Sequence, residues 1–214
     1  DLEKNTGIGD IPNFDKLPKI IQELLEEFQD IFTTKLTRGS RMHVEPVEFT
    51  LKKGWEPQEK ILGSRRCPRH FVQSGGNIID SLEEYGYIEK APRNARVVSP
   101  GMFIKKKPGS TEPRLVIDYK QTINEGILRP QHYQPSAEQL SEEFKPGLKV
   151  WAAMDIKSAY WLLPLAEGPN GSELTTFSTH LGNYSWRVMP MGVKPAGDYL
   201  AGTMVEVLAP VKEK

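Results

Sequence analysis

The segment from Val150 to Trp161 constrains the fold of this chain more than any other. Its apolar run ends in one carboxylate, Asp155, and Ala159 and Tyr160 follow within five positions. A buried strand that ends in a carboxylate can hold a metal ion at its tip, and an aromatic side chain close behind can wall a substrate pocket. Because one carboxylate does not complete a metal site, the same pattern also fits an aspartate that forms a turn or caps a helix.

Composition narrows the classes of protein that this sequence can encode. The 214 residues are 38% hydrophobic and 26% charged, which is typical of a globular protein with a core. The net charge is zero, so any nucleic-acid binding has to rest on local basic patches. Cys67 is the only cysteine, which excludes a disulfide framework and a cysteine-rich zinc site and fits a reducing compartment. No apolar run reaches the roughly 20 residues of a membrane helix, so no membrane partner is expected.

Apolar spacing and turn residues predict an order of helices and strands. Helical spacing is found at residues 17–32 and 71–87, with shorter helices at 138–144 and 198–208. Strand patterns are found at 44–52, at 95–107 and 114–119 as a hairpin around Pro108–Ser110, and twice within 175–188. The remaining predicted segments are an extended basic arm at 54–69 and a strand followed by a turn or helix at 149–165.

Two basic clusters have two interpretations each. Lys105–Lys107 lie at the predicted hairpin tip with Arg114 beyond the turn, where they either face solvent or clamp a triphosphate. Arg114 can hold a phosphate through two hydrogen bonds, whereas a lysine acts as a point charge. The second cluster lies in the arm and is either solvated or in contact with a nucleic-acid backbone: Arg65, Arg66, Arg69 and His70.

The segment Arg187–Gly197 has the Pro and Gly spacing of a plain loop. It leads into a predicted helix, however, and its small residues would let a backbone approach a base pair closely. Elsewhere the four histidines lack metal-ligand spacing, and neither a G-x-x-x-x-G-K-S/T phosphate loop nor a G-x-S-x-G elbow is present.

Several of these segments occur in an order that is found in one protein family. Phe103–Lys107 and Arg114–Lys120 are similar to its fingers hairpin, Met154–Tyr160 to its first palm motif, LDLxSGY, and Val188–Gly192, with Phe177 and Gly182 before it, to its MPFG motif. Further similar segments are the preceding helix at Leu24–Phe32, the GxIxxS...SP pattern at Gly86–Lys90 and Val98–Pro100, and Asn124 in the LN position. From Leu17 to Leu208 the chain resembles the reverse transcriptase domain of Ty3/gypsy-type long-terminal-repeat retroelement Pol polyproteins.

The resemblance implies an α+β fold, the fingers and palm of a right-hand polymerase, truncated before the second palm metal motif and the thumb. It implies an N-terminal leader and helix over residues 1–43, a fingers-like region over 44–149 and a partial palm over 150–214. For the complete enzyme it implies RNA-directed DNA polymerisation with Mg²⁺ as cofactor. The implied partners are an RNA or DNA template-primer and deoxynucleoside triphosphates, and the implied location is intracellular, in the cytoplasm or a virus-like particle.

The resemblance also assigns roles to matching residues. Asp155 is implied to be the first catalytic aspartate and a metal ligand, and the carbonyl of Ile156 to add a metal oxygen. Tyr160 is implied to be the gate under the sugar that excludes a 2′-hydroxyl, and Ala159 to leave space for the sugar. The other implied roles are triphosphate binding by Lys106 and Arg114, packing near the incoming nucleotide and the template base by Met191 and Gly192, and support of the fingers by Asp118.

The chain departs from the family pattern in two ways. First, several positions hold a residue that differs from the family pattern. This chain has Met191 where the family has an aromatic residue or glutamine, and Ala159 where it has Gly. It has Pro195–Gly197 in place of NAP, Asp198 and Tyr199 in place of Ala/Thr-Phe, and a different sequence over residues 60–76 in place of the RPYR.SP.E region. The 214 residues also contain no adjacent Asp-Asp pair, so the aromatic-x-Asp-Asp turn of the second metal motif is missing. Because two-metal phosphoryl transfer needs carboxylates that share the cations, the isolated chain is expected to bind Mg²⁺ weakly and to be inactive.

Three interpretations therefore stay open. The chain is a piece of a longer reverse transcriptase, which its start at Asp1 without a Met also indicates. Alternatively, it is a co-opted retroelement remnant that acts as a non-catalytic subunit or scaffold, with protein partners covering the truncated palm. The third interpretation is an α+β domain without retroelement origin. A reading frame that continues beyond Lys214 into an aromatic-x-Asp-Asp motif favours the piece of a longer reverse transcriptase. A stop codon at that point favours the co-opted remnant.

Overall fold

The computed structural model describes residues 13–29, 39–56, 60–132, 136–142, 147 and 155–212. The chain divides into two compact units, residues 1–40 and 41–214. The apolar run 150–154, with its predicted strand, lies outside the described residues, as do the ends of the predicted helices at 30–32 and 143–144. Among the helices that are described, none has the length and apolar character needed to cross a membrane.

The first unit contains one short helical pair. The 3-10 helix η2 (Phe14–Lys16) precedes α1 (Lys19–Glu27), and Pro18, with extended backbone angles, separates the two. The helix ends where Phe28 leaves helical geometry, although its amide still donates to the carbonyl of Leu24 at 3.2 Å. A helix is thus present where 17–32 was predicted, but α1 begins two residues later and, within the described residues, ends at Glu27.

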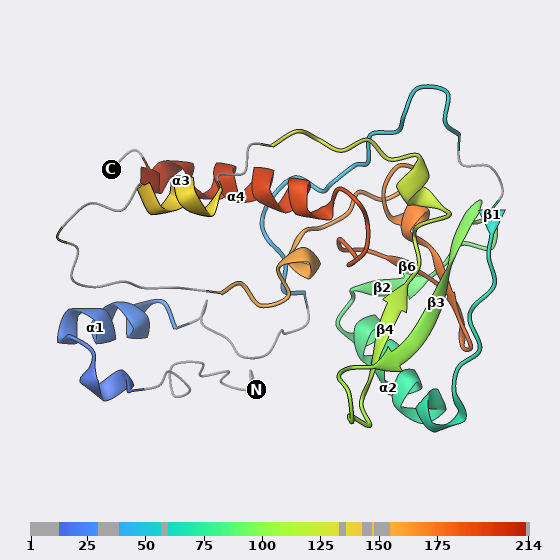
Figure 1. The fold of residues 1–214 in the computed structure, drawn as a ribbon, viewed down its shortest axis with the longest axis horizontal. Helices are drawn as coiled ribbons and strands as arrows, with labels where there is room; N and C mark the ends of the chain where they lie inside the picture. The colour runs from blue at the N-terminus through green and yellow to red at the C-terminus, as the bar shows by residue number, and fades with distance from the viewer. Residues whose placement is uncertain are drawn as a thin grey trace. The chain divides into compact units, whose positions relative to one another are not determined.

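The second unit is built on a six-stranded mixed sheet with the order β1-β3-β5-β6-β2 and with β4 paired to β3 (Figure 1). The strands are β1 (Lys60–Ile61), β2 (Ile88–Lys90), β3 (Val97–Lys105), β4 (Pro113–Ile117), β5 (Phe177–Thr179) and β6 (Gly182–Trp186). Strand β3 pairs in parallel with β1 and β5 and antiparallel with β4, whereas β6 pairs antiparallel with β5 and β2. This long central strand therefore connects the basic hairpin to the rest of the sheet.

The predicted hairpin is confirmed, and the two strands expected around Gly182 and Asn183 also form a hairpin, although both residues lie in β6 and the turn comes just before them. In the first, Gly101 pairs with Ile117 and Lys105 with Pro113, so the lysines lie at the tip as expected. In the second, Thr179 pairs with Gly182 across the turn. Gly101 is required where β3 passes β5, because a Cβ atom there would lie 2.5 Å from the carbonyl oxygen of Ser178.

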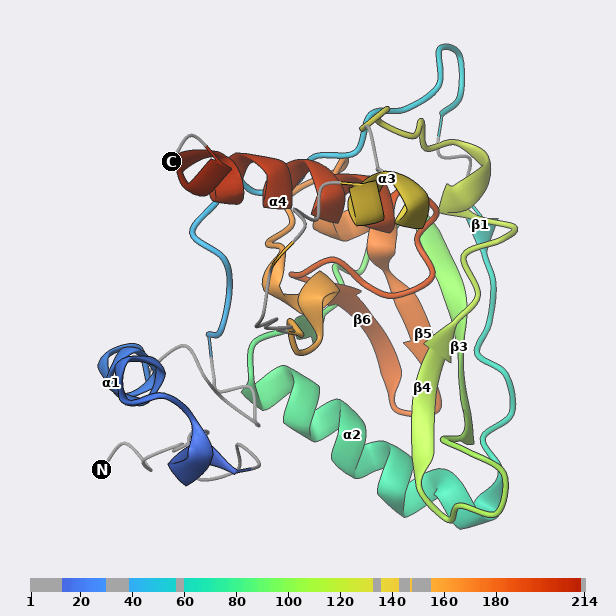
Figure 2. The same cartoon turned by 60° about the vertical axis from the view of Figure 1, so that its left-hand side comes forward.

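Helix α2 (Val72–Glu84) follows the 3-10 helix η3 (Arg69–Phe71) and lies along one face of the sheet (Figure 2). Gly75, which weakens the helix pattern in the sequence, allows this packing, since its Cβ position is 3.1 Å from the ring of Phe103 on β3. Gly86 adopts φ +71 just after the helix, and its carbonyl accepts a 2.5 Å hydrogen bond from Arg41.

The predicted helices near the C-terminus are also present. Helix α3 comprises Ala137–Glu142, and α4 comprises Ala196–Lys212, which is longer than the predicted 198–208 and includes Pro210. Three further 3-10 helices connect the sheet elements: η4 (Ile123–Glu125), η5 (Ala159–Leu162) and η6 (Ser172–Thr175).

The strand predicted at residues 44–52 does not form as a regular strand. The amides of Val47, Phe49 and Lys52 donate to three separate segments, at the carbonyls of Pro164, Asn170 and Gly126. The result is two isolated bridges, Val47 to Leu165 and Leu51 to Ile127. The alternating apolar residues, Val47 and Phe49 among them, are buried as predicted, but no single neighbouring strand runs beside them.

Candidate active site

Asp155 and Ile156 lie at the exposed beginning of the candidate site. Both side chains are exposed, Ile156 to 38%, and they precede a turn at Lys157–Ser158. Ser158 takes the left-handed conformation at φ 51 and thereby directs the chain into η5. The carboxylate of Asp155 is therefore accessible from solvent.

Trp161 fixes this segment to the core. Its ring centroid lies 5.6 Å from that of Tyr87 and 5.9 Å from that of Trp186, so it is part of an aromatic cluster that continues to Phe177. The following residues are held by backbone hydrogen bonds, from the Met189 amide to Leu163 at 2.9 Å and from the Leu165 amide to Arg187 at 3.0 Å. Leu163 itself is fully buried.

Tyr160 lies against the start of α4. Its hydroxyl oxygen is 3.7 Å from the position that a Cβ atom would occupy at Gly197, and both Ala159 and Tyr160 are half-buried. The Gly197 departure from the family pattern therefore lies directly beside the residue predicted to be the sugar gate.

The loop with Met191 and Gly192 contacts the end of the hairpin strand β4. Gly192 has φ +95, and a Cβ atom there would lie 3.5 Å from the carbonyl oxygen of Ile117. The side chain of Asn124 holds the loop from both sides, since it donates to the Gly192 carbonyl at 2.9 Å and accepts from the Lys194 amide at 2.8 Å. Met191 remains 55% exposed.

The two cations predicted to hold a triphosphate are on the hairpin. Arg114 is opposite Ile104 in the ladder, and the pairing continues to Lys106, whose amide donates to Glu112, so the side chains of Lys106 and Arg114 lie on the same face. Both are exposed, and Lys106 forms a 3.2 Å ion pair with Glu112 at the turn. Asp118, predicted to support the fingers, accepts a 3.0 Å hydrogen bond from the Lys120 amide.

The structure places Lys106 and Arg114 on one face of the hairpin and holds Gly192 and Tyr160 against residues outside the predicted set. Gly192 joins the MPFG-like loop to β4, and Tyr160 joins η5 to the helix that follows that loop. In the described part of the chain, no hydrogen bond or ion pair joins Asp155 to Lys106 or Arg114. Their functional roles remain predictions.

The described residues do not by themselves form a metal site. No group of three His, Cys, Asp or Glu side chains that could hold a metal ion occurs among them. Asp155 supplies one hard oxygen ligand, whereas Mg²⁺ takes an octahedral set and usually bridges phosphates between carboxylates. Further ligands must come from elsewhere if the ion binds here.

Two contacts that hold the start of α4 could not be predicted from the sequence. Arg129 forms a bidentate ion pair with the nearly buried Asp198, which holds the pKa of that carboxyl below its usual value. Tyr199 donates to the carbonyl of Glu48 at 3.2 Å, and burial raises its pKa. In the sequence, Asp198 and Tyr199 stand out only because they differ from the family pattern. Their partners, Arg129 and Glu48, are too distant along the chain to be predicted from it.

The sequence of this chain is similar to those of retroelement and viral polyproteins. The chain is 26% identical over 218 aligned residues to the Transposon Tf2-7 polyprotein of Schizosaccharomyces pombe, an alignment that covers 99% of this chain and 16% of that polyprotein. It is 28% identical over 120 residues to the Enzymatic polyprotein of Figwort mosaic virus, covering 55% of this chain and 17% of the relative. No protein-family model matches the sequence.

Solved structures agree with this relationship at the level of the fold. Prototype foamy virus protease-reverse transcriptase matches with a TM-score of 0.68 at 17% identity, over 91% of this chain and 25% of that chain. The foamy viral protease-reverse transcriptase in complex with double-stranded DNA matches with a TM-score of 0.67 at 14% identity, over 96% of this chain and 35% of that one. This chain is similar in sequence to retroelement polyproteins and similar in fold to the foamy viral protease-reverse transcriptases. The α+β fingers and palm fold predicted from the sequence is confirmed, and the chain spans only 16% of the Tf2 relative's length.

Proposed function

We propose that this chain is the fingers and palm part of an RNA-directed DNA polymerase encoded by a Ty3/gypsy-type retroelement. In the complete enzyme, the 3′-hydroxyl of a primer loses its proton and attacks the α-phosphate of a deoxynucleoside triphosphate. A phosphodiester bond forms, the bond between the α- and β-phosphates breaks, and pyrophosphate leaves. An RNA or DNA template-primer is the partner, and the site of action is intracellular, in the cytoplasm or a virus-like particle.

The observation that carries this proposal is the position of Asp155 and Tyr160. Asp155 is exposed at the start of a segment that Trp161 fixes to the core, and Tyr160 lies against α4 just after the loop that Asn124 holds. A rigid support of this kind is what a catalytic carboxylate needs, because small displacements of reacting groups lower the rate steeply. We propose that Asp155 is the first catalytic aspartate and that the Ile156 carbonyl lies beside it as a further oxygen ligand.

We propose that the remaining residues bind the sugar, the triphosphate and the template base. Tyr160 closes the space where a 2′-hydroxyl would lie, and Ala159 leaves room for the sugar. Lys106 and Arg114 neutralise the triphosphate, and both are exposed on one face of the hairpin. Met191 and Gly192 lie by the incoming nucleotide and template base, where the absence of a side chain at Gly192 allows close approach.

Magnesium is the cofactor expected for the complete enzyme. Because the described residues supply a single carboxylate from the predicted set, we expect residues 1–214 alone to bind Mg²⁺ weakly and to lack polymerase activity. Robust primer extension by residues 1–214 with Mg²⁺ would overturn this part of the proposal.

The central test uses the full-length reading frame that contains this chain. Asp155→Asn preserves the size of the side chain but removes its charge, and primer extension on an RNA template should fall by at least about a hundredfold. Asp80→Asn, an equally conservative change at an exposed position on α2, should extend primers at the normal rate. Normal extension by Asp155→Asn would exclude the proposed role.

A second candidate function has its own structural support. The C-terminal half of α4 exposes Val205, Val207 and Leu208 to 53%, 48% and 43%, and apolar surface of this kind favours contact with further protein. A non-catalytic subunit or scaffold would use this face for a partner. The reading frame distinguishes the candidates, since continuation into an aromatic-x-Asp-Asp motif supports the enzyme and a stop codon after Lys214 supports the scaffold.

A further inference from the structure

A polar pocket of about 390 Å³ lies beside the edge strand β2, between β2, β6 and residues 167–173. Its volume is within the roughly 300–1,000 Å³ of pockets that hold small ligands. Glu89 on β2 is paired with Ser185 on β6, so their side chains lie on one face of the sheet, and Arg187 follows on the same face. Among the described residues that line the pocket, none has a role in the proposed polymerase reaction.

The segment before η6 forms a fixed wall of this pocket, because its backbone folds closely on itself. The Ser172 amide donates to the Ala166 carbonyl at 2.8 Å, and the Glu173 amide donates to the Gly168 carbonyl at 3.2 Å. A Cβ atom at Gly171 would lie 1.9 Å from the Ala166 carbonyl oxygen, so only glycine fits at that position. The backbone therefore sets the positions of Ser172 and Glu173.

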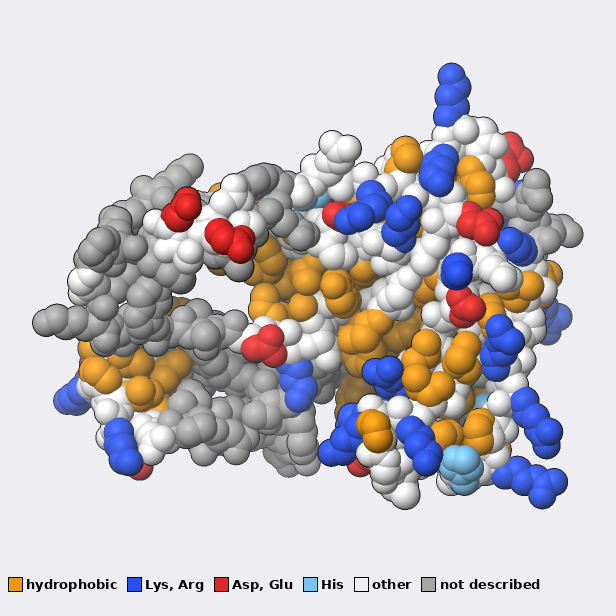
Figure 3. Space-filling view, in the orientation of Figure 1, with side chains coloured by type: hydrophobic (Ala, Val, Ile, Leu, Met, Phe, Trp, Pro, Cys, Tyr) orange, Lys and Arg blue, Asp and Glu red, His pale blue; other side chains and the backbone are white. Residues whose placement is uncertain are grey.

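Carboxylates outnumber cations among the described residues around the pocket, whereas over the sheet in Figure 3 acidic side chains lie singly among basic and hydrophobic ones. Arg187 joins two of these carboxylates, since it donates to Glu89 and to Glu167 at 2.7 Å each. Lys90 also lines the pocket, but its ammonium lies 4.0 Å from the ring centroid of Tyr184 and donates to the hydroxyl of that residue. One guanidinium thus serves two carboxylates, and negative charge remains in the pocket.

Two further side chains of the pocket wall have polar groups without a partner. The carboxylate of Glu173 is exposed and, within the described residues, forms neither a hydrogen bond nor an ion pair. Ser172 is only 5% exposed, yet its hydroxyl forms no hydrogen bond with any described residue. Buried hydroxyls are normally hydrogen-bonded, because taking them out of water without a partner costs free energy. The Ser172 hydroxyl is therefore available to a ligand in the pocket.

The second serine of the pocket is restricted to accepting a hydrogen bond from a ligand. Thr176 donates its one hydroxyl hydrogen to the carbonyl of Glu173 at 2.8 Å. In the 2.7 Å bond between the hydroxyls of Thr176 and Ser185, Ser185 is therefore the donor. Because its own hydrogen is used in this way, Ser185 can only accept from the pocket. Together with the Glu173 carboxylate, it presents oxygens that suit a ligand with N–H donors and a positive charge.

We propose that this pocket binds a primary ammonium group on an alkyl chain, supplied either by a lysine side chain of a polypeptide or by a free polyamine. An ammonium has three N–H donors and no acceptor, which matches single oxygens on three residues, Ser172, Glu173 and Ser185. A guanidinium donates from a planar fork and needs two oxygens side by side, which only Glu173 among these three offers. A metal ion matches less well, since the described residues contain no group of three His, Cys, Asp or Glu side chains that could hold one.

The test is isothermal titration calorimetry of residues 1–214 with three probes. Nα-acetyl-lysine methylamide carries one ammonium in peptide form, spermidine is a free polyamine, and the Nε-acetylated form of the lysine probe is its uncharged counterpart. At least one of the two ammonium probes should bind, and the uncharged probe should not. Glu173→Gln should raise the Kd about tenfold, because it removes a charged hydrogen bond, and Ser172→Ala should raise it about threefold.

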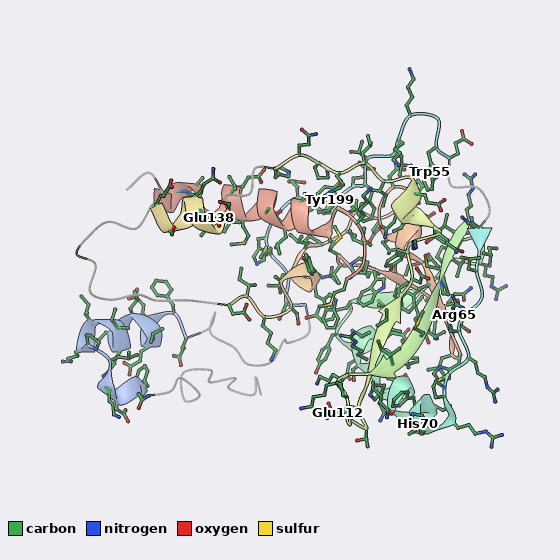
Figure 4. All side chains as sticks on the ribbon, viewed as in Figure 1. Trp55, Arg65, His70, Glu112, Glu138 and Tyr199 are labelled. Atoms are coloured by element: carbon green, nitrogen blue, oxygen red, sulfur yellow. The ribbon has the colours of Figure 1, made fainter. Side chains whose placement is uncertain are left out.

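The matched control is Glu138→Gln, which removes the same charge from an exposed side chain on α3, labelled in Figure 4. It should bind the ammonium probes as the wild-type chain does, and circular dichroism should show all variants folded. Tighter binding of the lysine probe would identify a polypeptide as the source of the ammonium, and tighter binding of spermidine would identify a free polyamine.

Three other results would overturn the inference. Equal affinity for the uncharged probe would show that the pocket does not recognise the ammonium. Equal losses in Glu173→Gln and Glu138→Gln would show that only net charge matters. Failure of both ammonium probes to bind the wild-type chain would reject the pocket as an ammonium site. Each result would leave the proposed function intact, because the residues proposed for polymerisation are not among those that line the pocket.

Discussion

Arg129 and Asp198 form a two-point ion pair, in which Nε and Nη2 of the arginine donate to the two carboxylate oxygens at 2.8 and 2.9 Å. Asp198 is only 7% exposed in the first turn of α4. Gly197, the adjacent residue, is the one that Tyr160 approaches. The pair therefore fixes the helix start that supports one wall of the candidate active site.

This ion pair predicts a loss of stability in acid. Hydrogen bonding from Arg129 lowers the pKa of Asp198 in the folded chain. Its stabilising contribution is therefore complete above the unfolded-state pKa, which is about 3.9 for aspartate, and is lost as the pH falls through the lower folded-state value. Asp198→Asn should lower the free energy of unfolding in urea at neutral pH, and the difference from wild type should shrink below about pH 4.

Asp80→Asn is the control for that measurement, because Asp80 is exposed on α2. It should have little effect at either pH. A deficit of Asp198→Asn that is the same in acid and at neutral pH would contradict the assignment, since it would not depend on the charge of Asp198.

The close approach of β3 and β5 predicts intolerance of a single methyl group. Gly101→Ala would place a Cβ atom 2.5 Å from the Ser178 carbonyl oxygen, so one strand must shift. The free energy of unfolding should fall by about 1–3 kcal/mol in urea titrations. Gly63→Ala, in the arm, has no atom within 4 Å of the new carbon and should be nearly neutral. Equal stabilities for the two variants would show that β3 and β5 leave room for a methyl group at Gly101.

Local patterns predicted the β3–β4 hairpin, the two strands within 175–188 and α2, because neighbouring residues determine these elements. The Pro108–Ser110 turn joins strands that pair as expected, and the turn between β5 and β6 lies within the predicted segment. Contacts between distant residues had no such signal. The fork between Arg129 and Asp198 spans 69 residues, and the failed strand at 44–52 depends on three different partner segments.

The two hydrogen bonds of Asn124 can be separated by substitution. Asn124→Asp keeps an oxygen for the Lys194 amide but loses the donor to Gly192, whereas Asn124→Ala loses both. Hydrogen exchange of the Lys194 amide should stay slow in Asn124→Asp and become fast in Asn124→Ala. The alanine variant should also lose roughly 1 kcal/mol of stability. Equal exchange in the two variants would mean that the carbonyl oxygen of Asn124 does not protect this amide.

Tyr160 is predicted to determine sugar selectivity in the full-length enzyme. Tyr160→Ala should reduce the preference for deoxynucleotides over ribonucleotides, measured as the ratio of kcat/KM values, by about 10- to 100-fold. Tyr160→Phe keeps the ring and should retain the preference. Undiminished selectivity in Tyr160→Ala would remove Tyr160 from the proposed gate.

The bond between the Ser178 hydroxyl and the Leu62 carbonyl joins residues 116 positions apart and has a consequence for synthesis on the ribosome. The arm and β3 are translated early, but the strand that pairs with β3 in parallel, β5, is translated much later. Contacts of such long sequence separation form slowly, because the intervening chain must first be closed into a loop. A nascent chain therefore carries its arginine arm incompletely anchored until the β5–β6 hairpin has emerged, and a pause in translation before that point would leave one side of β3 open to a chaperone.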